Sequence, residues 1–142
     1  MILLDANLLI YAYHADTPQH RAAVAWIEKM VEANEPVGVS WTSIWTFLRV
    51  STNPRLWPKP MDMASAAGAM RKFLAQPGIV LVEPGPRHLR ILEEIATQSQ
   101  ALGPLVSDAV LAAIAMEHGA TLASTDQDFS RFENLRWINP LR

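Results

Sequence analysis

Three aspartates stand beside apolar runs that lie far apart in the sequence. Asp5 interrupts the apolar opening of the chain, Asp108 lies early in an alanine-rich segment, and Asp126 follows a short aliphatic run. A carboxylate in such surroundings is costly to bury alone, so each must cap a helix, pair with another group or bind a cation. Clustered carboxylates suit a hard divalent cation such as Mg²⁺ or Mn²⁺, which relieves their repulsion. Such an ion lowers the pKa of bound water and polarises a phosphoryl oxygen, which is the chemistry of a metal-dependent nuclease.

Each acid also has a purely structural explanation. Asp5 has the position of a helix N-cap, Asp108 that of a first-turn acid, which the helix dipole favours, and Asp126 that of a capping residue in a turn. Asp128 is interpreted as a solvated turn acid rather than a ligand. It is the combined position of the first three acids that favours a metal site.

Short aliphatic runs that alternate with helical patterns predict an α/β fold with a mainly parallel sheet and helices on both faces. Strands are expected at 2–4, 36–40, 79–82, 121–124 and 135–138. Helices are expected at 6–13, 18–33, 41–50, 61–74, from the turn at 83–86 to about 98, and at 105–118. Ligand sites of such sheets lie beyond the carboxyl ends of the strands, where Asp5 and Asp126 stand. Asp108 joins them only if its helix starts at the same edge.

The composition predicts one globular domain, residues 1–142, with 50% hydrophobic and 18% charged residues. The formal net charge of −2 gives no global basic character, so binding to nucleic acid must depend on a local patch. The absence of cysteine excludes disulfides and thiolate catalysis, and fits a cytoplasmic protein. No signal peptide or membrane-spanning run is expected.

Basic and aromatic residues gather in or near a proline-rich loop at 51–60. Arg49, Arg55 and Lys59 can pair with phosphate, and Trp57 can stack on an unpaired base, so these four are the predicted contacts with a nucleic acid. The alternative for Trp57 is a place in the core or in a dimer contact.

Several segments, in order, resemble motifs of the PIN-domain ribonucleases, in particular the VapC-like toxins of type II toxin–antitoxin pairs. Leu4–Asn7 resembles the first motif, Val106–Ala113 the third, and Leu122–Phe129 the fourth. Thr52–Arg55 and Trp137–Leu141 resemble a subgroup of these toxins. The resemblance covers nearly the whole chain.

This resemblance implies a three-layer α/β/α domain, Mg²⁺- or Mn²⁺-dependent endonucleolytic cleavage of RNA, an antitoxin partner and a homodimer. Asp5, Asp108 and Asp126 would hold the ion directly or through water, and the ion would activate water for in-line attack on a phosphodiester. Asn7 and Ser124 would orient ligands or substrate.

Thr46 departs from the family pattern, because the second motif usually carries a Glu at this position. The site then binds metal with fewer acids, Asp128 compensates, or activity is reduced. This leaves an alternative in which the chain is a catalytically weakened PIN domain that binds RNA or a partner. A metal-dependent phosphatase is a third reading, but it would typically need an Asp-x-Asp pair, and position 7 is Asn.

Three tryptophans lie on two predicted helices. With Met30 and Val31 they form an apolar set of Trp26, Met30, Val31, Trp41 and Trp45, and most of this set is expected in the core. The alternative is that they contribute to a groove for an antitoxin helix and to a dimer face.

Overall fold

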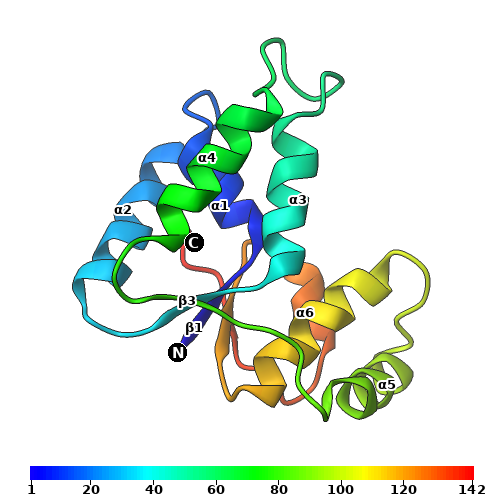
Figure 1. The fold of residues 1–142 in the computed structure, drawn as a ribbon. Helices are drawn as coiled ribbons and strands as arrows, with labels where there is room; N and C mark the ends of the chain where they lie inside the picture. Colours follow the sequence, from blue (N-terminus) through cyan, green and yellow to red (C-terminus); the bar gives the residue numbers. More distant parts are fainter.

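A computed structural model describes residues 1–142, and its centre is a sheet of five parallel strands (Figure 1). The strands are β1 (Ile2–Leu4), β2 (Val37–Val39), β3 (Ile79–Leu81), β4 (Thr121–Ala123) and β5 (Trp137–Ile138). Their order in the sheet is β3-β2-β1-β4-β5, and every neighbouring pair is parallel. β1 therefore lies at the point where the chain turns from one half of the sheet to the other, which is where open α/β sheets place their ligand sites.

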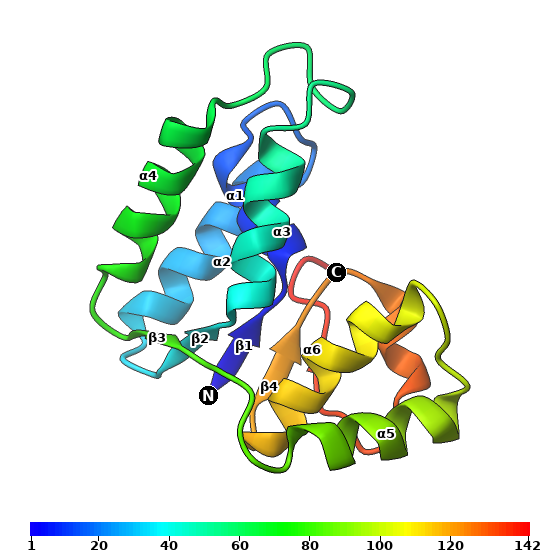
Figure 2. The same cartoon turned by 45° about the vertical axis from the view of Figure 1, so that its right-hand side comes forward.

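Helices cover both faces of this sheet. They are α1 (Ala6–Tyr13), α2 (His20–Glu32), α3 (Trp41–Ser51), α4 (Met63–Leu74), α5 (His88–Ser99) and α6 (Leu105–Glu117), followed by the short 3₁₀ helix η1 (Gln127–Arg131). α1 to α4 lie on one face, and α5 and α6 lie on the other (Figures 1 and 2). The predicted three-layer α/β/α architecture is confirmed. None of the helices combines the length and the apolar character that crossing a bilayer requires.

Alternation along β1 divides the core between these two faces. Leu3 and Leu122 pack with α5 and α6, whereas Leu4 and Ala123 pack with α1 to α4. All four side chains are fully buried. Because successive residues of a strand point to opposite faces, β1 and β4 hold the two cores together. The carboxyl ends of these two strands are therefore fixed relative to each other.

Four strands are one or two residues shorter than expected, α4 begins at Met63 and not at position 61, and two further details differ from the sequence-based expectations. The second helix begins at His20 and not at position 18, because the Thr17 hydroxyl donates to the carbonyl of His14 in a turn that precedes the helix. Trp26, Met30 and Val31 pack against the core, as expected for most of the apolar set, but Trp41 and Trp45 do not, since they are 39% and 60% exposed. The buried face of α3 carries Ile44 and Phe47 instead.

Candidate metal centre

Asp5 is the first residue after β1. Its backbone N–H donates to the carbonyl of Ala123 on β4 (3.0 Å), so the carboxyl ends of the two strands meet here. Its Oδ1 accepts from the N–H of Ala6 (2.7 Å) and caps α1, as predicted. Its Oδ2 accepts from the hydroxyl of Ser124 (2.6 Å). Burial raises the pKa of Asp5 and the charge of Asp126 raises it further, against the lowering effect of the two hydrogen bonds.

Ser124 joins the first acidic segment to the last. It is fully buried, and besides donating to Asp5, its Oγ accepts from the backbone N–H of Asp126 (3.0 Å) and from Nδ2 of Asn7 (3.2 Å). Asn7 also donates to the Thr125 hydroxyl (2.9 Å), while its own Oδ1 is buried without a hydrogen-bond partner. These bonds fix the loop after β4 against the turn after β1.

Three further carboxylates converge beside this network. Asp108, Asp126 and Asp128 each offer an oxygen, and these oxygens lie within 4.8 Å of one another. Asp108 belongs to the first turn of α6, so this helix does start at the same edge of the sheet. Asp128 is exposed, and its N–H donates to Oδ1 of Asp126 (2.9 Å). Asp128 is a turn acid, as expected, but its carboxylate also belongs to the cluster.

Burial and neighbouring negative charges raise the pKa of Asp108. Burial, followed by the charges of Asp126, Asp5 and Asp128, raises the pKa of Asp108 to about 6, and only Arg131 acts against this rise. Such repulsion is relieved by a cation, and an all-oxygen donor set suits Mg²⁺ or Mn²⁺. The Oδ1 of Asn7, whose amide nitrogen donates to Ser124, is buried without a hydrogen-bond partner. The residues present therefore fit a divalent ion.

The raised pKa of Asp108 predicts a pH-dependent stability in metal-free protein. Because this pKa lies above the ordinary value of 3.8, the unfolding free energy falls as the pH rises through this range to about 6. In EDTA and at neutral pH, Asp108→Asn should raise the unfolding free energy by about 1 kcal/mol, because solvent screening reduces the effect that the full pKa shift would give. At about pH 4 the substitution should not change the unfolding free energy, because Asp108 is then protonated in the folded protein.

Urea unfolding of wild type and variant at both pH values checks this expectation. Asp62→Asn is the control, because the N–H of Ser65 lowers the pKa of Asp62 and the opposite sign is expected. An Asp108→Asn protein that is no more stable than wild type at neutral pH would refute the proposed repulsion.

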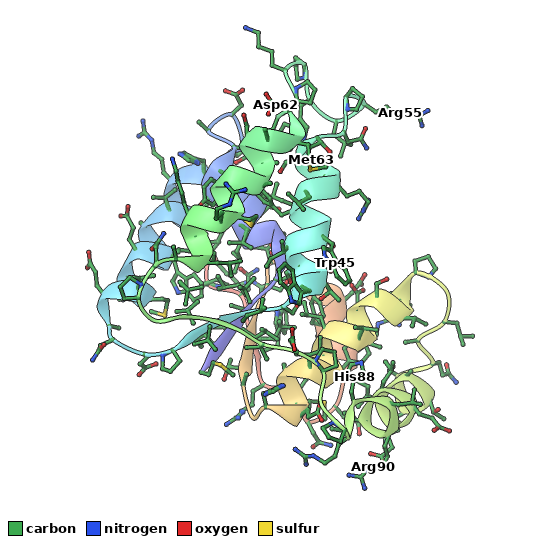
Figure 3. The ribbon with its side chains drawn as sticks, in the orientation of Figure 1. Trp45, Arg55, Asp62, Met63, His88 and Arg90 are labelled. Carbon is green, nitrogen blue, oxygen red and sulfur yellow. The ribbon has the colours of Figure 1, made fainter.

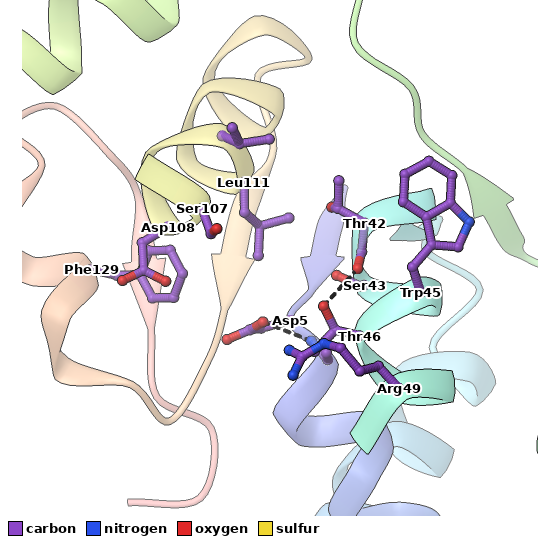
Figure 4. A pocket seen from close by; sticks show the side chains of 12 residues that line it. Asp5, Thr42, Ser43, Trp45, Thr46, Arg49, Ser107, Asp108, Leu111 and Phe129 are labelled. Carbon is purple, nitrogen blue, oxygen red and sulfur yellow. Dashed lines mark hydrogen bonds between the residues drawn. The ribbon is translucent and has the colours of Figure 1, made fainter. Parts of the chain in front are cut away.

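A cavity of about 700 Å³ opens beside these acids. Asp5 and Asp108 lie along one side of it, and Trp45, Thr46 and Arg49 of α3 line the other (Figure 4). The cavity is therefore negative on the side of β1 and α6, with one guanidinium on the side of α3.

Thr46 lines this cavity, so the position that carries Glu in the family pattern does face the acids. Its hydroxyl donates to the carbonyl of Thr42 (2.9 Å), one turn earlier in α3 (Figure 4). The hydroxyl proton is therefore already used within the helix, and Thr46 brings no charge to the site. Sequence reasoning missed Ser43, which also lines the cavity and whose hydroxyl donates to the carbonyl of Leu4 (3.2 Å). A hydroxyl early in a helix that follows a strand was the available signal.

Restoring a carboxylate at this position should tighten metal binding. Thr46→Glu is expected to lower the dissociation constant for Mn²⁺ by about tenfold, because each added charge strengthens an oxygen site. Thr52→Glu is the matched control, since Thr52 makes the same bond to a carbonyl one turn earlier (Leu48, 2.7 Å) but lies outside the cavity. Calorimetric titration with Mn²⁺ measures both. Equal tightening in the two variants would show an unspecific effect of charge.

The four predicted RNA contacts do not lie together. Arg49 lines the acidic cavity, whereas Arg55 projects from the tip of the loop beyond α3 (Figure 3). Trp57 stacks on His14, with ring centroids 4.0 Å apart, and its Nε1 donates to the carbonyl of Val50 (2.9 Å). Lys59 and Trp57 line a separate cavity. Arg49 is therefore the predicted contact best placed to reach a substrate at the acids.

The amino-acid sequence is similar to those of known proteins over nearly its whole length. Residues 2–135 match the profile of the PIN domain. Ribonuclease VapC31 of Mycobacterium tuberculosis H37Rv is 40% identical over 141 residues, which is 99% of each chain. The chain belongs to the VapC group of PIN-domain proteins. Ribonuclease VapC33 of the same organism is 38% identical over 142 residues, covering 100% of this chain and 99% of the relative.

Solved structures show the same PIN fold. The structure of VapBC2 from Rickettsia felis, bound to a DNA fragment from its promoter, matches with a TM-score of 0.75 at 18% identity over 98% of both chains. M. tuberculosis VapC20, described as a toxin that cleaves the sarcin–ricin loop, matches with a TM-score of 0.63 at 19% identity over 96% of this PIN domain and 99% of that chain. The alternative of a catalytically weakened binding module finds no support, because the relatives are named ribonucleases.

Proposed function

We propose that this PIN domain is the toxin of a toxin–antitoxin pair and a Mg²⁺- or Mn²⁺-dependent endoribonuclease. The observation that carries the proposal is the cluster of the Asp108, Asp126 and Asp128 carboxylates beside the carboxyl ends of β1 and β4. Asp5 and Asp108 also lie in the wall of a cavity that holds Arg49, and the charge of Asp5 contributes to the raised pKa of Asp108. Relatives at about 40% identity that are named ribonucleases support the proposal.

Asp108 and Asp126 would hold the ion, with Asp5 bound directly or through water and Asp128 in support. When bound, a divalent cation lowers the pKa of water and stabilises negative charge on phosphoryl and leaving oxygens. Ser124 keeps the Asp5 carboxylate in place by its 2.6 Å hydrogen bond.

Arg49 and Asn7 act on the two sides of this centre. Arg49 binds a phosphate of the RNA from the opposite wall of the cavity, since a guanidinium pairs well with phosphate oxygens. Asn7 holds the segment of Ser124 and Thr125 in place, and its buried Oδ1, which has no partner, would accept a bond from a ligand or a water. Arg55, Trp57 and Lys59 would contact parts of the RNA farther from the cleaved bond.

The remaining parts of the proposal concern the assembly. Residues 1–142 act as a single domain in the cytoplasm, form a homodimer and are inhibited by an antitoxin protein. Support for the antitoxin comes from structures such as VapBC-1 of Haemophilus influenzae, which matches with a TM-score of 0.74 at 16% identity over the whole of both chains.

RNA cleavage by the purified protein tests the proposed activity. Total bacterial RNA should yield discrete fragments in Mg²⁺, none in EDTA, and the same fragments again when excess Mg²⁺ is restored. Fragments that persist undiminished in EDTA would contradict metal dependence. Intact RNA under all metal conditions would contradict the ribonuclease.

A further inference from the structure

Trp45 is the most exposed of the five tryptophans, with 60% of its surface open to solvent. Its side chain is also one of those that line the acidic cavity (Figure 4). A large apolar side chain in the wall of a polar cavity is not explained by the packing of the core, which uses Ile44 and Phe47 of the same helix. Such surface is typical of a binding site.

Trp45 belongs to a stripe along α3. Trp41, Trp45 and Arg49 are each four residues apart, so they share one face of the helix. The rings of Trp41 and Trp45 are nearly parallel, with centroids 6.4 Å apart and an interplanar angle of 22°. Nε1 of Trp41 donates to Oε1 of Glu83 (3.1 Å), which ties Trp41 to the segment after β3. Trp41 therefore supports Trp45, which is the more exposed ring of the pair.

We propose that Trp45 stacks on an unpaired RNA base beside the phosphate held at the acidic cavity. This inference rests on the proposed function and adds to it a residue that binds a base. Bases within a regular duplex are already stacked on their neighbours, whereas a splayed base is free to stack on an indole.

The surroundings of Trp45 favour RNA over another protein as its partner. Arg49, one turn away on the same face, offers a guanidinium to a phosphate while the indole offers a flat apolar surface to a base. With a net charge of −2, the chain has no global attraction for RNA, so local contacts of this kind must supply the affinity. A second copy of the chain seated on Trp45 would instead cover the wall of the cavity that the substrate must enter.

Binding of two labelled oligomers tests the inference. One is an unstructured RNA of about 12 nucleotides, and the other has the same length of backbone with abasic spacers in place of the bases. Fluorescence anisotropy is measured on an Asp126→Asn background, which prevents cleavage. Trp45→Ala should weaken binding of the RNA by about 10- to 100-fold and leave the abasic oligomer unchanged. Trp45→Phe, which keeps an aromatic ring, should retain most of the affinity.

The matched control is Leu89→Ala, which removes an exposed apolar side chain (74%) from α5, outside the cavity, and should change neither affinity. Equal affinity of Trp45→Ala and its parent for the RNA would overturn the inference. So would an equal loss for both oligomers together with an altered sedimentation coefficient, because that pattern marks a contact between protein copies.

Cleavage of RNA by the otherwise wild-type chain separates the two proposals. If the chain cleaves RNA in Mg²⁺ but its affinity for RNA does not depend on Trp45, the stacking proposal is wrong and the proposed ribonuclease activity stands. Binding that depends on Trp45 without any cleavage overturns the ribonuclease and leaves the stacking in place. Neither cleavage nor binding by the wild-type chain overturns both.

Discussion

Asp5→Asn should reduce metal-dependent RNA cleavage by more than about 100-fold while the protein remains folded. Asn is as good an N-cap as Asp, so its amide oxygen can keep the bond from the N–H of Ala6, while its amide N–H2 replaces Oδ2 and can donate to the hydroxyl of Ser124. What the substitution removes is a negative charge beside Asp108 and Asp126. Since Thr46 supplies no carboxylate, this loss is not offset from α3.

The matched control is Asp62→Asn, because Asp62 is also an N-cap and accepts from the N–H of Ser65 (2.7 Å) at the start of α4. It lies outside the acidic cavity, so cleavage should be unchanged. The rate of RNA cleavage in Mg²⁺, together with the far-ultraviolet circular dichroism of each protein, measures the difference. If Asp5→Asn cleaved at the wild-type rate, Asp5 would be a helix cap and no more.

Ser124→Ala should lower the unfolding free energy by about 2–3 kcal/mol and also impair cleavage. The substitution removes the donor to Asp5 and the acceptor for the N–H of Asp126, and it leaves these partly buried groups without these partners. A buried polar group that loses its partner costs more than the net value of one hydrogen bond. The two acidic segments would also lose the side-chain bond that sets their spacing.

Ser51→Ala is the control for this variant. Ser51 is equally buried, but its hydroxyl bonds only Nε2 of His14 (2.9 Å), outside the acidic cavity. A loss of about 1 kcal/mol with normal cleavage is expected for it. Urea unfolding and cleavage rates compare the two. Matching losses in both variants would mean that Ser124 has no special place in the site.

The acidic site was largely predictable because its chemistry follows the order of the strands. Asp5 and Asp126 each come directly or almost directly after a strand, and parallel strands end at one edge of the sheet, so their approach followed from local pattern. Asp108 was different, because only the axis of α6 brings a first-turn acid to that edge. The hydrogen bonds of Ser124 depend on distances between segments more than 100 residues apart, which no local pattern contains.

The exposure of Trp41 and Trp45 also has a physical cause. α3 carries apolar residues on more than one face, and periodicity alone does not tell which face meets the sheet. Ile44 and Phe47 take the buried face, and Trp41 and Trp45 are left toward solvent and the cavity. The predicted loop contacts failed to gather for a similar reason, because the loop at 51–60 folds back so that Trp57 packs on His14.

Binding of Mn²⁺ to the purified protein tests the central claim, that these acids form one metal centre, most directly. Electron paramagnetic resonance of free Mn²⁺ during a titration measures binding to wild type, Asp126→Asn and Asp62→Asn. We expect the wild type and Asp62→Asn to bind Mn²⁺ with the same affinity, and Asp126→Asn to bind it at least about 100-fold more weakly. Binding of Mn²⁺ by Asp126→Asn with the affinity of the wild type would contradict the metal centre described here.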